Sequence, residues 1–306
     1  MIPSVDFVGG KFVGTLVEDV AGDEILGAGF RPLCHSLYPK QNLYRDYGVG
    51  LNFEHIMNGT SADKSINKFT PRLDPRSVVS HDTCSASILN RGEESTWQVD
   101  SEMRYDISSE HAIDMTFSAV LQAERFPLGY VAFMWASYMN RTRERRIHFL
   151  GEDSGVQGWT SFGDDTPEAH SDFETGTVSS AAAPDLPYEK GADTLNILEH
   201  RGKKFTKPFY YGLVDGDGDL STTDDTMVYI MMFDHTSSVR FAMWNFICDA
   251  SGNPDPHSPA WDWQYVIRNP IIGQPYGYRA RMVYKPFVDR ADVEKEYEDW
   301  RAQLGP

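Results

Sequence analysis

Hydrophobic and polar positions alternate with a period of two along much of the chain. The clearest example is the stretch STWQVDSEMRYDI at residues 95–107. One face would carry Trp97, Val99, Ser101, Met103 and Tyr105, and the other Gln98, Asp100, Glu102 and Arg104. This period predicts a β-strand with one buried and one solvated face. Residues 111–123 repeat the pattern, whereas residues 128–139, LGYVAFMWASYM, are apolar on both faces, as in a central strand.

Further stretches are rich in the β-branched and aromatic residues that favour strands. They cover residues 10–19, 77–89, 145–151, 194–202, 207–215, 226–235, 238–247, 262–268 and 277–287. Gly, Asn, Asp and Pro separate many of them, and the string FDHTSSVRF predicts a hairpin with a Thr-Ser-Ser turn. Because no amphipathic helices alternate with these strands, a parallel α/β sheet is disfavoured. We therefore expect one all-β domain over residues 1–306, a large antiparallel β-sandwich.

Residues 289–305, DRADVEKEYEDWRAQLG, show a helical period. Asp289 can cap the start of this helix and Gly305 can end it. One side of it carries Val293, Tyr297, Trp300 and Leu304, which we expect to pack on the edge of the sheet. Two long N-terminal and central loops are expected at residues 31–76 and 152–193, and loops of this length in a compact domain are more often functional than accidental.

The charge and the cysteines narrow the possible partners and the compartment. The formal net charge of −17 repels nucleic acid and anionic membrane surfaces, so we expect neither as a partner. No window approaches the apolar length of a membrane span. Three widely spaced cysteines, Cys34, Cys84 and Cys248, predict free thiols. With no basic and apolar leader pattern at the N-terminus, we expect a cytoplasmic protein.

The string DGDGDLSTTDD at residues 215–225 raises the question of a calcium site. Asp215, Asp217 and Asp219 match the first three acidic positions of an EF-hand loop. Leu220 stands where that loop needs glycine, Thr226 stands where it needs glutamate, and the flanking segments are predicted strands. We therefore expect mainly a solvated turn and no required cofactor, with Ca²⁺ held by these three aspartates as the alternative.

A second concentration of chemistry lies at residues 35–55, HSLYPKQNLYRDYGVGLNFEH. Histidine titrates near neutrality, and tyrosine, glutamate and arginine supply proton donors, bases and cations. The catalytic candidates here are His35, Tyr38, Glu54 and His55, and Arg45 is a substrate-binding candidate. The alternative is an ordered loop in which these histidines and tyrosines bond to the backbone.

Other candidates lie on predicted strands. His81 is either a further catalytic residue or a core histidine, and Glu102 with Arg104 either binds a ligand or forms a surface ion pair. Trp stacks on sugar rings and Arg binds carboxylates with two hydrogen bonds, although tryptophan also fills cores. The substrate-binding candidates are Arg45, Glu102, Arg104, Trp135, His235, Arg240, Trp244 and Arg279.

The rhythm of strands over residues 75–287, with long N-terminal loops and strands bearing Trp, His and Arg, resembles a known family. This is the galactose-mutarotase-like supersandwich, whose fold is shared with several polysaccharide lyases. The resemblance is architectural and implies a carbohydrate-active β-sandwich. The string NFEHIMNG at residues 52–59 is only loosely similar to an Asn–His motif of the sugar epimerases and stands earlier in the chain, so no catalytic role is carried over.

These observations favour a carbohydrate-active enzyme that acts on an acidic sugar or polysaccharide. The preferred chemistry is that of a lyase or epimerase, in which His or Tyr moves a proton and Arg stabilises the resulting anion, with His55 as the proton carrier. One alternative is a non-catalytic carbohydrate-binding protein, and another is a glycoside hydrolase that uses Glu54 and Glu102 as its carboxylate pair. We expect residues 31–58 to fold over a concave sheet face that carries Glu102, Arg104, Arg240 and Trp244.

Overall fold

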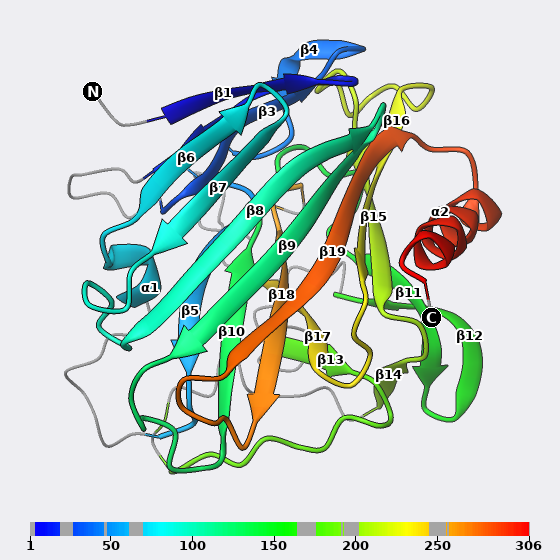
Figure 1. Ribbon diagram of the computed structural model, residues 1–306. Coiled ribbons are helices and arrows are strands. Elements are labelled where there is room, and N and C mark those ends of the chain that lie inside the picture. The colour runs from blue at the N-terminus through cyan, green and yellow to red at the C-terminus, as the bar shows by residue number, and fades with distance from the viewer. Residues whose placement is uncertain are drawn as a thin grey trace.

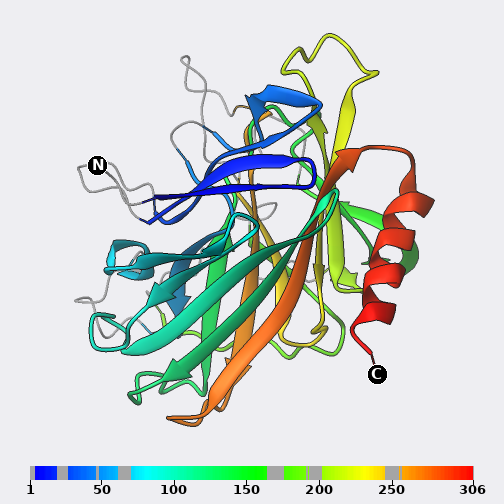
Figure 2. The same cartoon turned by 45° about the horizontal axis from the view of Figure 1, so that its top comes forward.

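A large and a small antiparallel sheet pack face to face, and a third sheet lies across one end (Figures 1 and 2). The computed structural model describes residues 4–18, 27–45, 48–60, 70–163, 176–190, 192, 202–244, 255 and 257–305. The predicted all-β sandwich with a C-terminal helix is confirmed. In the described part of the chain, no helix is long and apolar enough to cross a membrane.

The large sheet forms the front of the sandwich in Figure 1. Its strands, in spatial order, are β12 (Val156–Phe162), β11 (Ile147–Asp153), β15 (Phe209–Asp215), β16 (Thr226–Phe233), β19 (Pro275–Pro286), β9 (Ala112–Leu121), β8 (Val99–Ser109), β7 (Ser85–Asn90) and β6 (Ser77–Asp82), and β14 (Lys203–Phe205) pairs with β11. The alternation read at residues 95–107 is confirmed on β8, where Val99, Met103 and Tyr105 are buried.

The small sheet lies behind the large one and contributes the other half of the core. Its strands, in spatial order, are β13 (Gly176–Ser179), β17 (Val239–Trp244), β18 (Ala260–Arg268), β10 (Tyr130–Ala136) and β5 (Asn52–Met57). The two sheets meet where Phe117 on β9 packs edge-on against Trp135 on β10, with ring centroids 4.7 Å apart. Trp135 in turn stacks on Trp263 at 5.5 Å, so aromatic rings fill the space between the sheets.

The third sheet is N-terminal and has the order β1 (Ser4–Gly9), β2 (Phe12–Val17), β3 (Gly29–His35) and β4 (Tyr38–Asn42). Residues 31–76 were expected to form a loop, and this expectation is wrong, because β3, β4 and β5 and the short helix α1 (Thr70–Leu73) occupy much of the segment. These strands were not predicted because polar side chains such as Lys40 and Gln41 interrupt the hydrophobic pattern of the segment. The loop expected at 152–193 likewise contains β12 and β13, and the strand expected at 194–202 falls almost entirely outside the described residues.

Two further expectations need correction. The Thr-Ser-Ser turn does not close a hairpin, because β16 belongs to the large sheet and β17 to the small one, so this turn carries the chain between sheets. Helix α2 (Arg290–Gln303) begins after the predicted cap Asp289, which accepts a hydrogen bond from the Asp292 amide. However, α2 packs its buried residues on the outer face of the large sheet, against β15, β16 and β19, and not on its edge.

Cys34 and Cys84 are free thiols, as predicted, and Cys248 lies outside the described residues.

Candidate functional site

The face of the small sheet that points away from the core carries buried polar side chains. Strand pairing places His55 opposite Met134, Met134 opposite Gln264, and Gln264 opposite Arg240, so these side chains form one row across the sheet. Asp262 lies in the next row on the same face, because side chains two residues apart on a strand share a face. The intervening positions, which point into the core, are Trp135, Trp263 and Phe241.

We call this group the polar layer, and it consists of Asn52, Glu54, His55, Arg72, Tyr138, Arg240, Asp262 and Gln264. Of these, His55, Arg240, Asp262 and Gln264 are at most 4% exposed. Burying polar and charged groups is costly unless they are paired, so such a layer is retained either for structure or for chemistry.

Glu54 contacts four other residues of the polar layer. Its carboxylate contacts the Arg72 guanidinium at 2.5 Å, and the Tyr138 hydroxyl lies 2.7 Å and 2.9 Å from its two oxygens. The Asn52 amide donates to it at 3.4 Å, and the His55 Nε2 atom lies 3.5 Å away. A carboxylate with several donors, one of them a cation, is a positioned hydrogen-bond acceptor.

A β-bulge explains why Glu54 and the adjacent His55 can both reach this layer. On β10, the consecutive residues Met134 and Trp135 pair with His55 and Phe53, so Glu54 is the extra residue of β5. A bulge breaks the strict alternation of a strand and redirects a side chain, and bulges are frequent beside active sites. Phe53 thereby stays in the core while Glu54 turns towards Arg72 and Tyr138.

Asp262 is the second carboxyl group of the polar layer. It is 1% exposed, and one of its oxygens accepts a hydrogen bond from the Ser137 amide at 3.0 Å. Burial, reinforced by the nearby charge of Glu54, raises the pKa of Asp262 well above its usual range, and the Ser137 amide offsets this only in part. Asp262 therefore favours its protonated form more than an exposed aspartate does, and a second carboxyl group of the same layer, Glu54, is held by several donors.

Tyr138 completes this arrangement from the segment that follows β10. Arg72 donates to its hydroxyl at 3.1 Å, while the hydroxyl faces Glu54. Burial, with the Glu54 charge, raises the pKa of Tyr138 well above its usual value, so it acts as a neutral donor. Of the residues predicted from sequence, Glu54 and His55 meet here, and Arg240 lies in the same row as His55, three strands away.

The structure separates the other candidates of residues 35–55 from this layer. His35 is fully buried on β3, where its Nε2 atom lies 3.1 Å from the Nδ1 atom of His111 and its Nδ1 atom accepts from the Leu37 amide. Burial, with the neighbouring His111 and Lys11, lowers the pKa of His35 to about 4. Arg45 lies next to Tyr138 only through its backbone, whose amide donates to the Tyr138 carbonyl at 2.9 Å.

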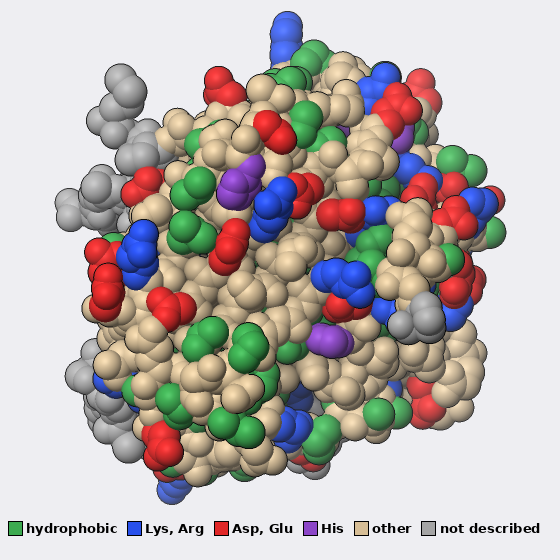
Figure 3. All heavy atoms as spheres, in the orientation of Figure 1, with side chains coloured by type: hydrophobic (Ala, Val, Ile, Leu, Met, Phe, Trp, Pro, Cys, Tyr) green, Lys and Arg blue, Asp and Glu red, His purple; other side chains and the backbone are tan. Residues whose placement is uncertain are grey.

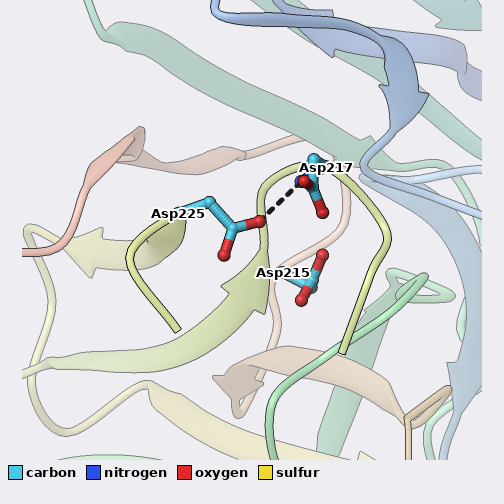
Figure 4. A group of neighbouring side chains, drawn as sticks. All are labelled: Asp215, Asp217 and Asp225. Atoms are coloured by element: carbon cyan, nitrogen blue, oxygen red, sulfur yellow. Dashed lines mark hydrogen bonds between the residues drawn. The ribbon is translucent and has the colours of Figure 1, made fainter. Parts of the chain in front are cut away.

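The aspartate string is a turn, but it is less solvated than expected. Asp215 is fully buried and Asp225 is 8% exposed, whereas Asp219 points away into solvent and caps its own turn at Ser221. Asp215, Asp217 and Asp225 have carboxylate oxygens within 4.8 Å of one another (Figure 4). The trio therefore includes Asp225 in place of the predicted Asp219.

The side chain of Arg143 supplies the positive charge in this trio. Its NH2 atom lies 2.8 Å from Asp215 and also contacts Asp225, and its NH1 atom donates to the carbonyl oxygens of Leu220 and Thr222. The predicted catalytic residue Tyr38 packs beside this loop, where burial and the aspartate charges raise the pKa of its hydroxyl. One guanidinium therefore offsets part of the charge of the three carboxylates.

Four candidates lie on the outer face of the large sheet, which Figure 3 shows from the front: His81, Glu102, Arg104 and Arg279. His235 lies in the β16–β17 connection, where its ring stacks on Tyr265 of the small sheet and its Nε2 atom lies 3.1 Å from the Gly277 carbonyl oxygen. The Ser87 hydroxyl donates its proton to Glu102 at 2.7 Å. The His81 Nε2 atom lies 2.8 Å from the Ser87 Oγ atom, so His81 must donate to Ser87. His81 is therefore not placed as a base for Ser87. Arg104 pairs with Asp106 of the same strand at 2.8 Å, and not with Glu102 as the alternative had it.

The remaining predictions are corrected by the two-sheet arrangement. Glu102 and Arg104 lie on β8 of the large sheet, whereas Arg240 and Trp244 lie on β17 of the small sheet, so these four do not share one face. The same separation removes Glu54 with Glu102 as a hydrolase pair. Trp135 is fully buried between the sheets and serves the core.

Sequence reasoning missed Asp262, Gln264, Tyr138 and Arg72. The signal for two of them was present in the string AWDWQYVIR at residues 260–268, where Asp262 and Gln264 alternate with tryptophans. Polar residues at alternate positions of a strand that is otherwise apolar indicate a polar row on a buried face.

No protein-family model matches the chain, and no curated protein matches it. Solved structures of the galactose mutarotase and aldose 1-epimerase type are similar to it. A GalM/aldose epimerase homologue from C. elegans matches with 10% identity over 94% of this chain and 100% of that one, at a TM-score of 0.48. Galactose 1-epimerase from Lactobacillus acidophilus NCFM matches with 9% identity over 94% of this chain and 100% of that one, at a TM-score of 0.43. The Slr1438 protein from Synechocystis sp. PCC 6803 matches with 9% identity over 94% of this chain and 97% of that one, at a TM-score of 0.49. At these TM-scores we transfer no residue role or activity.

Proposed function

We propose that this protein is a carbohydrate-active enzyme of the epimerase type, with its acid–base pair in the polar layer. One observation carries the proposal: two buried carboxyl groups of that layer have opposed environments. Glu54 accepts from Arg72 and Tyr138, whereas Asp262 has one backbone donor and a strongly raised pKa. Two carboxyl groups whose environments differ in this way can divide the roles of base and acid.

The chemistry follows from what an epimerisation requires. A sugar hemiacetal changes its anomeric form when a base takes the proton of the anomeric hydroxyl while an acid protonates the ring oxygen. The carbon–oxygen bond of the ring then breaks and re-forms on the other face. We assign the base role to Glu54, the acid role to Asp262, and proton exchange with the base to His55, which lies 3.5 Å from it.

An acidic sugar is the finer proposal for the substrate. Arg240 lies in the same row as His55 and Gln264, so a cation is available on the face that holds the acid–base pair. A guanidinium can hold a carboxylate with two hydrogen bonds and orient the ring above the carboxyl groups.

The test is to measure anomer exchange of aldoses and uronates by NMR magnetisation transfer, with and without protein. Glu54→Gln and Asp262→Asn keep the shape of each side chain and remove its acid–base role. We expect both to lose at least about a hundredfold in exchange rate. Asp74→Asn is the matched control, because Asp74 is also buried but bonds to Thr96 outside the polar layer. Equal exchange in all four proteins, or exchange in none, would refute the proposal.

A further inference from the structure

A cavity of about 570 Å³ opens at one end of the sandwich, separate from the polar layer. Five connections contribute to its lining: the residues after β5 and the β7–β8, β9–β10, β13–β14 and β18–β19 connections. The β9–β10 and β18–β19 connections lie together at the bottom of Figure 1. The volume falls in the range of small-molecule sites in proteins.

Hydrogen bonds between these connections hold the cavity in shape. The Asn58 side chain donates to the Arg125 carbonyl at 2.7 Å, and the Asn269 amide donates to the Gly129 carbonyl at 2.7 Å. The Glu189 amide donates to the Gly59 carbonyl at 2.8 Å. Because these bonds fix the backbone, a ligand would meet a preformed site and lose little affinity to loop ordering.

The cavity lining combines an aromatic pair with polar side chains. Phe126 is partly exposed and lies parallel to the buried Trp97, with ring centroids 6.0 Å apart. Arg125 reaches the Gln98 side chain with two long bonds of 3.3 Å, and it forms no ion pair with any residue in the described ranges. The exposed side-chain amide of Asn269 stands at the rim, on a backbone fixed at a positive φ of 46°.

We infer that this cavity binds an uncharged pyranoside. The apolar face of a sugar ring fits an aromatic wall, and ring hydroxyls donate to carboxylates and accept from guanidinium and amide groups. Glu124 and Glu189 line the cavity together with Arg125, so its lining has an excess of one negative charge if all three are ionised. This local excess of negative charge disfavours an anionic ligand in the cavity, whereas the polar layer offers Arg240.

This inference stands apart from the proposed function, because it assigns binding and no reaction to the cavity. Titration calorimetry with methyl β-galactopyranoside, methyl β-glucopyranoside and glucuronate, at low ionic strength, measures it directly. We expect at least one methyl pyranoside to bind, and Arg125→Gln and Phe126→Leu to weaken that binding about tenfold or more each. Binding of glucuronate at the polar layer should not change in either variant.

Arg91→Gln is the matched control, since Arg91 is exposed and lies outside the cavity lining, and it should bind as the parent does. Glu54→Gln should also bind normally. Loss of binding in Glu54→Gln but not in Arg125→Gln would place the sugar in the polar layer and overturn the inference. Glucuronate binding that Arg125→Gln and Phe126→Leu weaken, or no pyranoside binding at all, would overturn it as well.

Discussion

The Tyr138 hydroxyl lies between Arg72 and Glu54, 3.1 Å from the guanidinium and 2.7 Å from the nearer carboxylate oxygen. Tyr138 and Glu54 are 84 residues apart in the chain, and they meet because β5 pairs with β10. A hydroxyl donates one proton, so Tyr138 accepts from Arg72 and gives its proton to Glu54. The three groups therefore orient one another.

Replacing Tyr138 with Phe removes this donor and leaves the packing. We expect turnover in the anomer-exchange assay to fall about tenfold or more, because Glu54 loses the group that orients it. The melting temperature should fall by no more than a few degrees, as for the loss of one hydrogen bond.

Tyr105→Phe is the control for that experiment. Tyr105 is 1% exposed, and its hydroxyl donates to the Leu51 carbonyl at 2.8 Å, outside the polar layer. If both variants lost activity to the same extent, the effect of Tyr138→Phe would be one of packing.

Asp262→Asn should reverse a stability cost that depends on pH. The folded-state pKa of Asp262 is raised above the ordinary value of 3.8, mainly by burial. When the pKa of a group is raised by folding, its protonation contributes to the unfolding free energy. This contribution of Asp262 is fully present below the pKa of the unfolded state and is lost as pH rises towards the folded-state pKa. Relative to the parent, Asp262→Asn should therefore gain unfolding free energy as pH rises above about 4, as measured by urea unfolding at several pH values.

Asn keeps an oxygen that can accept from the Ser137 amide, so the comparison isolates the charge. Asp74→Asn, carried through the same pH series, shows what a buried carboxyl outside the layer contributes. A difference between Asp262→Asn and the parent that stays constant with pH would contradict the raised pKa.

How far the sequence could go is clearest at β8 and β18. On β8 the apolar and polar residues alternate, so the buried face that contains Met103 and Tyr105 could be read directly. On β18 both faces are buried. Its tryptophans predicted a core strand, and the polar second face that Asp262 and Gln264 indicate was not predicted. Glu54 and His55 could be named as candidates, but the bulge that directs Glu54 to Tyr138 depends on pairing with β10, a contact remote in sequence.

The His35–His111 contact predicts a loss of stability in mild acid. Burial lowers the pKa of His35 from 6.5 to about 4, and it lowers that of His111 as well. When the pKa of a group is lowered by folding, its unprotonated form contributes to the unfolding free energy. This contribution of His35 is complete above the pKa of the unfolded state and is lost as pH falls through the folded-state pKa. The unfolding free energy should thus decrease between pH 6.5 and about 4, by on the order of 2 kcal/mol from His35.

His35→Gln should flatten this part of the pH curve, because glutamine can accept from the Leu37 amide but does not titrate in this range. His257→Gln is the control, since that imidazole contacts only the Thr142 carbonyl among the described residues. An unchanged slope in His35→Gln would show that other groups cause the acid sensitivity.

Arg143 determines how the aspartate trio responds to calcium. In the parent protein its guanidinium already contacts Asp215 and Asp225, so millimolar Ca²⁺ should leave the melting temperature unchanged. Arg143→Gln leaves the buried Asp215 without its cation, and the loss of one partner of a buried ion pair costs about 3–5 kcal/mol. The three carboxylates, with oxygens within 4.8 Å of one another, would then repel one another.

Calcium should therefore stabilise Arg143→Gln and not the parent, because a divalent cation can replace the missing charge and a ligand that binds only the folded state raises its stability. Thermal unfolding with calcium chloride, and then with excess chelator, measures this for both proteins. Adding Asp217→Ala to Arg143→Gln should abolish the calcium effect, since Asp217 supplies the third carboxylate. A large stabilisation of the parent by calcium would mean that the cation can displace the Arg143 side chain, and the turn would then be a metal site.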